Sequence, residues 1–193
     1  MKIKSITYVG LFAAIMGALS LVPPIFLSFT PVPVTVQTLG VLLAGGLLGA
    51  RLGAMSQLVF LLLVAAGMPL LSGGRGGLSV FTGPSAGYIL SWPITAYCVG
   101  LLIPLFRKEK IINILLINLT VGIFLIYLIG IPVQAFMMDI SIYKAVQINY
   151  FYIPGDILKA ILASILIYRL RKHPVFSRLL KNNSNPGKQK KAS

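Results

Sequence analysis

A carboxylate and an amine lie three residues apart at the start of the last apolar segment of this chain, where Asp156 is followed by Lys159. Residues at this spacing share one face of a helix and can form an ion pair. The other two acidic residues, Glu109 and Asp139, fall between apolar segments. An ionisable group inside a membrane segment costs about 2.5–3.5 kcal/mol on insertion scales, and such groups usually serve a function. The pair therefore predicts a clamp for a small polar ligand, in which the carboxylate accepts N–H donors and the ammonium meets a carbonyl or carboxylate.

The same pair also has a purely structural interpretation. Pro154 and Gly155 precede Asp156, so this carboxylate could cap or open a helix, where the dipole and the free N–H groups favour negative charge. Lys159 would then only hold the helix end near the membrane boundary. The residues alone leave both interpretations open.

A glycine-rich stretch, Gly73-Gly74-Arg75-Gly76-Gly77, is the second candidate for binding. Glycines before a helix allow the backbone to pack over a ligand as a lid, although a merely flexible loop has the same composition. Arg75 is the basic residue of this stretch and suits an anionic ligand or a lipid headgroup. The phosphate-binding pattern G-x-x-x-x-G-K-[ST] occurs nowhere in the chain, so ATP hydrolysis by this chain unaided is not predicted.

The composition indicates a helical membrane protein. Hydrophobic residues make up 57% of the chain and charged residues 10%, and the mean hydropathy is +0.92. The apolar runs are continuous, which is typical of helices and not of barrel strands. We expect an all-α integral membrane protein, a six-helix bundle with a re-entrant or lid-like outer loop, in one domain over residues 1–172. The predicted spans cover 5–22 (a retained first helix), 34–49, 52–71, 85–106, 111–136 and 154–170.

The distribution of positive charge predicts the orientation of these spans. With both termini in the cytoplasm, the inner positions carry fourteen of the 17 Lys and Arg residues, and the outer loops carry only Arg75 and Lys144. Cytoplasmic loops of membrane proteins carry such an excess of positive charge, so we expect a protein of the cell membrane with both termini on the cytoplasmic side. The outer loops would be 23–33, where four prolines oppose helix formation, 72–84 and 137–153.

The remaining basic residues favour lipid over nucleic acid as a partner. The segment 173–193 is predicted to be a basic, disordered cytoplasmic tail, and no aromatic residues are interleaved among its cations from Arg178 onward to stack on bases. Basic residues next to a membrane span instead meet anionic lipid headgroups of the bilayer. A single cysteine, Cys98, and an isolated His173 predict neither a disulfide nor a metal site.

The first predicted span contains two overlapping pairs of small residues four apart, Ala13 with Gly17 and Ala14 with Ala18. Small residues at this spacing allow close approach of two helices in lipid. The partner would be another helix of this chain or another subunit.

These features together resemble the biotin-specific membrane component, the BioY family, of energy-coupling-factor vitamin transporters. The resemblance covers most of residues 5–170. It rests on Phe29-Thr30-Pro31-Val32-Pro33-Val34-Thr35-Val36-Gln37-Thr38-Leu39-Gly40, the loop 73–77, Gly83-Pro84-Ser85-Ala86-Gly87-Tyr88, and Pro154-Gly155-Asp156 with Lys159.

The resemblance implies a subunit that captures biotin from outside, without a cofactor, together with a transmembrane coupling protein and two ATP-hydrolysing subunits. It implies that Ala14 and Ala18 face the coupling protein. The ureido N–H groups of biotin suit Asp156, whereas Lys159 and Arg75 are candidates for the ureido carbonyl and the valerate carboxylate, in either order. The implied substrate-binding residues are Asp156, Lys159, Arg75, Gln37, Thr35, Gly76, Gly77, Gly83 and Tyr88.

Three other functions are consistent with parts of this pattern. The chain could capture another vitamin, which ligand competition would reveal. An intramembrane enzyme could use Asp156 and Lys159 as acid and base, but no second carboxylate, metal motif or activated nucleophile accompanies them. A structural or assembly protein would bind no small molecule and would tolerate substitution of Asp156. We therefore expect a transport subunit and not an enzyme.

Overall fold

The computed structural model describes residues 3–106 and 110–176, and each predicted span contains a helix. The predicted predominantly helical architecture is confirmed. The π-helix η3 (Asn118–Ile123) joins α5 to α6 within one continuous helical segment, Ile111–Met137. The helices of the bundle are α1 (Ile3–Leu19), α2 (Gln37–Leu48), α3 (Ala50–Ala65), α4 (Ala86–Leu102), α5 (Ile111–Ile117), α6 (Phe124–Met137) and α8 (Ile153–Arg171). Two short 3-10 turns, η1 (Leu78–Thr82) and η2 (Ile103–Leu105), precede and follow α4.

A two-stranded antiparallel hairpin precedes α2, and the sequence did not predict it. Strands β1 (Ile25–Leu27) and β2 (Thr30–Val34) pair Ile25 with Val34 and Leu27 with Thr30. The prolines of this region exclude helix as expected, because proline lacks the N–H and restricts the preceding residue to extended backbone. The predicted span 34–49 therefore begins as extended chain, and its helix starts only at Gln37.

A short helix, α7 (Ile142–Asn149), lies within the predicted outer loop 137–153 and was also missed. Its N-cap is Ser141, whose hydroxyl accepts a hydrogen bond from the Lys144 N–H at 3.3 Å. Helix α7 meets α8 at a bend of 57°. Eight residues of mixed polarity do not give the long apolar run from which a span is predicted.

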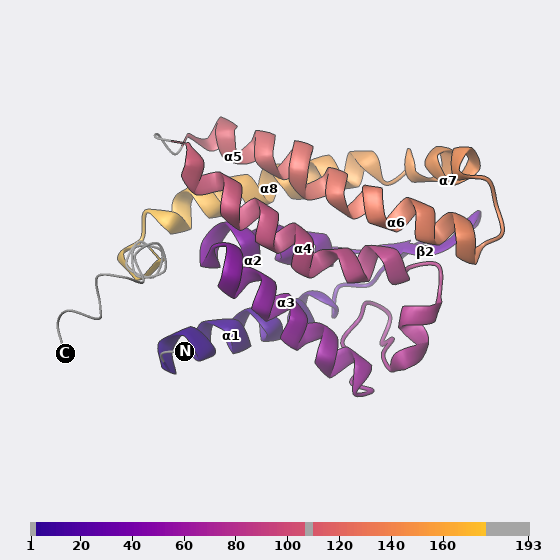
Figure 1. Ribbon diagram of the computed structural model, residues 1–193, viewed down its shortest axis with the longest axis horizontal. Coiled ribbons are helices and arrows are strands. Elements are labelled where there is room, and N and C mark those ends of the chain that lie inside the picture. The colour runs from indigo at the N-terminus through magenta and orange to yellow at the C-terminus, as the bar shows by residue number, and fades with distance from the viewer. Residues whose placement is uncertain (1–2, 107–109, 177–193) are drawn as a thin grey trace.

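Helix α2 lies at the centre of the bundle, and nine of its 12 residues are buried. Helix α4 packs against α2, α3 and α6 (Figure 1). Glycine allows this close approach: a Cβ atom at Gly45 would lie 2.5 Å from the carbonyl oxygen of Ala96. Small residues at helix contacts are typical of membrane bundles, where packing replaces the hydrophobic effect as the force between helices.

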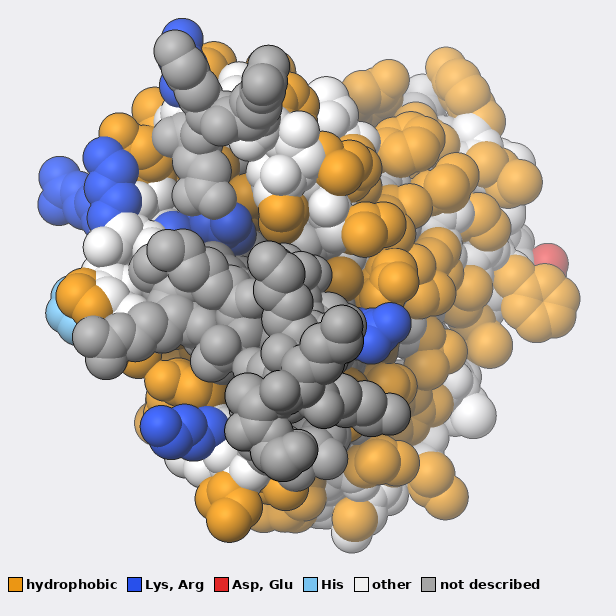
Figure 2. Space-filling view, turned by 60° about the vertical axis from the view of Figure 1, so that its left-hand side comes forward, with side chains coloured by type: hydrophobic (Ala, Val, Ile, Leu, Met, Phe, Trp, Pro, Cys, Tyr) orange, Lys and Arg blue, Asp and Glu red, His pale blue; other side chains and the backbone are white. Residues whose placement is uncertain are grey.

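The two ends of the bundle differ in charge. The start of α1 and the end of α8 lie at one end, whereas β2 and α7 lie at the opposite end (Figure 1). Lys and Arg side chains gather at the first end, and the flank beside it is largely hydrophobic (Figure 2). The exposed cations at the helix ends there are Lys4, Arg51, Lys110, Arg169 and Lys172.

Within the described residues, two helical segments, Ala86–Leu105 and Ile111–Met137, are long and apolar enough to cross a membrane. The bent pair of α7 and α8 would be a third, whereas α1, α2 and α3 are apolar but shorter. Six complete crossings therefore remain a prediction. Of the predicted tail 173–193, only residues 173–176 lie within the described range, and there the Phe176 ring packs 6.4 Å from that of Tyr8.

Candidate ligand-binding site

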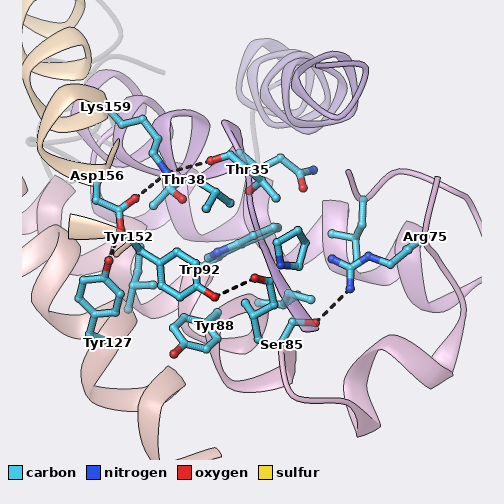
Figure 3. Close-up of a pocket in the computed structure, with 17 residues that line it drawn as sticks. Thr35, Thr38, Arg75, Ser85, Tyr88, Trp92, Tyr127, Tyr152, Asp156 and Lys159 are labelled. Atoms are coloured by element: carbon cyan, nitrogen blue, oxygen red, sulfur yellow. Dashed lines mark hydrogen bonds and ion pairs between the residues drawn. The ribbon is translucent and has the colours of Figure 1, made fainter. Parts of the chain in front are cut away.

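A cavity opens where β2, the first turn of α2 and the first turns of α8 meet (Figure 3). It contains about 620 Å³ of empty space, part of it open to solvent. The extended residues before α2 form one wall. Irregular backbone at membrane depth is tolerated where it lines such a cavity. The lining residues are Val32, Pro33, Val34, Thr35, Gln37, Thr38, Leu71, Arg75, Ser85, Tyr88, Ile89, Trp92, Ile126, Tyr127, Tyr152, Asp156 and Lys159.

The first turns of α8 place Asp156 and Lys159 together at one end of the cavity. The Lys159 Nζ lies 2.5 Å from Oδ1 of Asp156 and donates a second hydrogen bond, at 2.8 Å, to the Thr35 carbonyl. The Tyr127 hydroxyl donates to the other carboxylate oxygen of Asp156. The position of Asp156 in the first helical turn is favoured by the helix dipole.

This arrangement leaves hydrogen-bonding capacity free on both charged groups. A carboxylate has about four lone-pair sites and an ammonium has three donors. Among the described residues, Lys159 and Tyr127 occupy two of the sites on Asp156, and Asp156 and Thr35 occupy two of the donors of Lys159. The pair can therefore accept two N–H groups and donate once to an oxygen without losing its present contacts.

Aromatic rings form the middle of the cavity. Trp92 lies one helical turn beyond Tyr88 on α4, and the rings of Tyr88 and Tyr127 meet edge to face with centroids 6.4 Å apart. Tyr152, which lies in the turn before α8, forms another wall of the cavity. These rings, with Ile89 and Leu71 among the lining residues, suit an apolar ring system or chain.

A buried polar network holds two of these tyrosines in place. The Tyr88 hydroxyl lies 2.5 Å from Oε1 of Gln134 and 2.9 Å from Oδ1 of Asn149, and the Asn149 amide donates to the same Gln134 oxygen. The Tyr152 hydroxyl donates to the Val32 carbonyl at 2.8 Å and lies 3.0 Å from Oγ1 of Thr30. The Gln134 amide also donates to Oγ1 of Thr30 at 3.4 Å, so the hairpin is connected through Gln134 to α4, α6 and α7 and through Tyr152 to the start of α8.

Arg75 lies at the other end of the cavity, beside Ser85 (Figure 3). Its Nε donates to the Ser72 carbonyl at 3.3 Å and its Nη1 to the Ser85 hydroxyl at 3.4 Å. Partial burial lowers the pKa of the guanidinium from its usual value, and the group stays charged at neutral pH. A guanidinium has five N–H donors, so donors remain for an anion.

The structure separates the residues that the resemblance implied into three groups. Asp156, Lys159, Arg75, Thr35, Gln37 and Tyr88 line the same cavity. Gly76 and Gly83 instead line an adjoining outer cavity, and Gly77, at φ +83°, lines neither. The amide of Gln37 is fully used: it donates to the carbonyls of Met16 and Leu70 and accepts twice from Ser72. In this conformation Gln37 holds the glycine loop to α2 and has no free hydrogen-bonding group for a ligand.

Sequence reasoning missed Trp92, Tyr127, Tyr152 and the network residues Gln134 and Asn149. Helical spacing offered a signal for two of them, because Trp92 follows Tyr88 by four residues and Tyr152 precedes Asp156 by four. No local pattern identifies Tyr127 or Gln134, since each meets its partner across a different helix.

The small residues of α1 divide between two faces. Ala14 and Ala18 are exposed, whereas Ala13 is buried in the core. Gly10, one turn before Ala14, has no atom of the described residues near the position of a Cβ. The exposed face of α1 is therefore available for a close contact with another helix.

Comparison with known proteins agrees with this arrangement. Residues 1–174 match the family described as the BioY family. The chain is 45% identical to the probable biotin transporter BioY of Bacillus subtilis (strain 168), over 88% of this chain and 91% of that protein. It is 41% identical to the biotin transporter BioY of Rhizobium etli, over 86% and 92% of the two chains.

A solved structure is similar over almost the whole fold. It is the crystal structure of the S-component for biotin from an ECF-type ABC transporter, with a TM-score of 0.88 and 34% identity, and the match covers 93% of this chain and 96% of that one. The relatives are transporters, in agreement with the expectation of a transport subunit and not an enzyme. With a match over residues 1–174, this chain belongs to the BioY family.

Proposed function

We propose that this chain captures biotin at the outer face of the cell membrane, as the substrate-specific component of an energy-coupling-factor transporter. One observation carries the proposal: a cavity with a carboxylate–ammonium pair at one end, aromatic walls in the middle and a guanidinium at the other end. The names of the relatives point to the same ligand.

The free hydrogen-bonding sites match the groups of biotin in number and type. The two ureido N–H groups would donate to the open lone pairs of Asp156, and the remaining N–H of Lys159 would donate to the ureido oxygen. The sulfur-containing ring and the valerate chain would lie against Trp92 and the tyrosines. Arg75 would then meet the valerate carboxylate with a charge-assisted hydrogen bond.

Selectivity follows from burial of the pair. Asp156 is 8% exposed. A ligand that covers it without donating N–H groups would therefore leave lone pairs of a desolvated carboxylate without a hydrogen-bond donor. Such unpaired polar groups produce strong discrimination against analogues that lack the matching group. A vitamin without a ureido or similar donor pair is therefore a poor ligand for this cavity.

We place both termini in the cytoplasm and the cavity toward the outside. The exposed cations at the helix ends lie at the end of the bundle opposite β2 and α7, and positive charge favours the cytoplasmic side. In this orientation α1, α2, α3, α4, the segment Ile111–Met137 and α8 each cross the bilayer. The hairpin shortens the crossing of α2, as in transporters whose helices are interrupted at the binding site.

The coupling protein would contact the exposed face of α1, and two ATP-hydrolysing subunits would supply the energy. Ala14 and Ala18 are exposed on this face, and their small side chains would allow a helix of the coupling protein to approach closely. Ala14→Leu should reduce copurification with a coexpressed coupling protein while biotin affinity stays within twofold. Ala66→Leu, which adds the same bulk at an exposed alanine after α3, is the matched control.

Calorimetric titration of biotin into the detergent-purified chain tests the proposal, with thiamine and riboflavin as competitors. Stoichiometric binding of biotin alone, with the ligand recovered intact, is the expected result. Binding of another vitamin in its place would preserve capture and change the ligand. A folded chain that binds none of them would favour a structural role.

A further inference from the structure

A second cavity adjoins the first on its outer side and contains about 700 Å³ of space that is partly open to solvent. It is lined by Pro31 and by residues 74–76, 79–80 and 83–85. Strand β2, the glycine loop, η1 and the turn before α4 therefore surround it. Nothing in the biotin-binding scheme described above occupies this space.

The two cavities share Arg75 and Ser85. The guanidinium lies at the end of the inner cavity that is remote from Asp156 (Figure 3), and its side chain is hydrogen-bonded to Ser85. A ligand held at Asp156 that extends toward Arg75 thus points its far end at the outer cavity. The two shared residues are polar, and a hydrogen bond of 3.4 Å joins them.

The wall of the outer cavity is made largely of small residues. Gly74, at φ +71°, and Gly83 have no bulky side chain, and Ser79 is exposed at the cavity wall. Gly76 is held against Met68, because a Cβ atom there would overlap the Met68 carbonyl. Among the described lining residues Arg75 is the charged one, so the space suits a polar or zwitterionic group without requiring a particular charge.

We propose that the outer cavity accepts a substituent attached to the carboxyl carbon of biotin, so that this chain also binds biotin amides such as biotinyl-lysine. The inference rests on the proposed function, because it takes the ureido ring to be held at Asp156. An amide carbonyl at Arg75 accepts a hydrogen bond as a carboxylate does. The lysine part, with its own carboxylate and amine, then lies among the glycines beyond.

The test compares biotin with biotinyl-lysine by titration into the same detergent-purified full-length chain. The wild-type chain should bind biotinyl-lysine with an affinity within tenfold of that for biotin. Ser79→Phe fills the outer cavity and should weaken biotinyl-lysine at least tenfold while biotin stays within twofold. Thr82→Phe adds the same ring at another exposed position of η1 that does not line the cavity, and it should change neither affinity more than twofold.

The outcomes separate the two proposals. Tight binding of biotin without measurable binding of biotinyl-lysine would overturn the present inference and leave biotin capture intact. Equal losses for both ligands in Ser79→Phe, or no loss for either, would show that the substituent does not enter the outer cavity. Failure of a folded wild-type chain to bind biotin itself would remove the proposed function and this inference with it.

Discussion

Replacement of Asp156 by asparagine distinguishes a ligand clamp from a purely structural role. The expectation that Asp156 caps the helix is wrong, because α8 begins at Ile153 with Tyr152 as its N-cap and no side chain among the described residues caps it. Asparagine keeps the shape of the side chain and one acceptor oxygen, so a side chain with a purely structural role would leave the ligand affinity unchanged. It removes the negative charge and one of the two acceptor oxygens. A clamp that receives two N–H donors would be weakened by it.

The expected loss of affinity can be worked out from the hydrogen bonds. A bond to a charged group contributes about 1.5–3 kcal/mol and a neutral bond about 0.5–1.5 kcal/mol, so each of two ligand bonds weakens by about 1 kcal/mol. The sum of about 2 kcal/mol corresponds to an increase of about thirtyfold in Kd. Calorimetry with biotin measures this change directly.

A second variant separates binding from stability. Asp156→Asn leaves the Lys159 ammonium, 12% exposed, without its ion-pair partner, and breaking a buried pair on one side is destabilising. Adding Lys159→Met removes the unpaired charge and should recover most of the thermal stability in detergent. It should not recover biotin affinity.

The matched control is Asp139→Asn, which makes the same chemical change at an exposed carboxylate outside the cavity. Asp139 has φ 51°, a conformation that asparagine adopts readily, so neither stability nor binding should change. Biotin affinity within twofold of wild type in a folded Asp156→Asn variant would refute the clamp and leave only the structural interpretation.

Two further substitutions test the frame around the cavity. Gln134→Leu should lower thermal stability by about 1–3 kcal/mol, because Tyr88 and the Asn149 amide each lose a buried partner. The control Gln147→Leu, at an exposed position, should not lower the thermal stability. Equal melting temperatures for the two variants would refute the stabilising role of the hydrogen bonds of Gln134. Gly45→Ala should destabilise by about 1–3 kcal/mol, because its Cβ would overlap the Ala96 carbonyl. Gly10→Ala meets no neighbour in the interior of α1 and should stabilise by up to about 1 kcal/mol in the same unfolding assay.

The helices and the two charged ends of the cavity could be predicted because their signals are local. An apolar run of about 20 residues indicates a helix without knowledge of its neighbours. Asp156 and Lys159 are conspicuous in such a run, and their spacing places them together. The hairpin escaped prediction because its prolines exclude helix but do not specify a pairing partner.

The walls between those ends could not be predicted, because their contacts join distant parts of the chain. Tyr127 reaches Asp156 across 29 positions, and Lys159 reaches the Thr35 carbonyl across 124. Neither contact leaves a spacing rule in the sequence. Gly76 and Gly83, which their motif marked for the substrate site, line the adjoining cavity, so a role in binding stays a prediction for them.

Two of the hydrogen bonds around the cavity end on the extended segment before α2, at the carbonyls of Val32 and Thr35. Lys159 binds the Thr35 carbonyl and Asp156, which also receives the Tyr127 hydroxyl, and on the other side Tyr152 binds the Val32 carbonyl. Lys159 is therefore both a proposed ligand contact and a contact of the extended segment before α2. Where the position of this segment changes the affinity for biotin, binding of biotin favours that position by the same free energy, since coupling between two equilibria is reciprocal. A substitution of Lys159 is accordingly expected to alter the ligand contact and the support of this segment together.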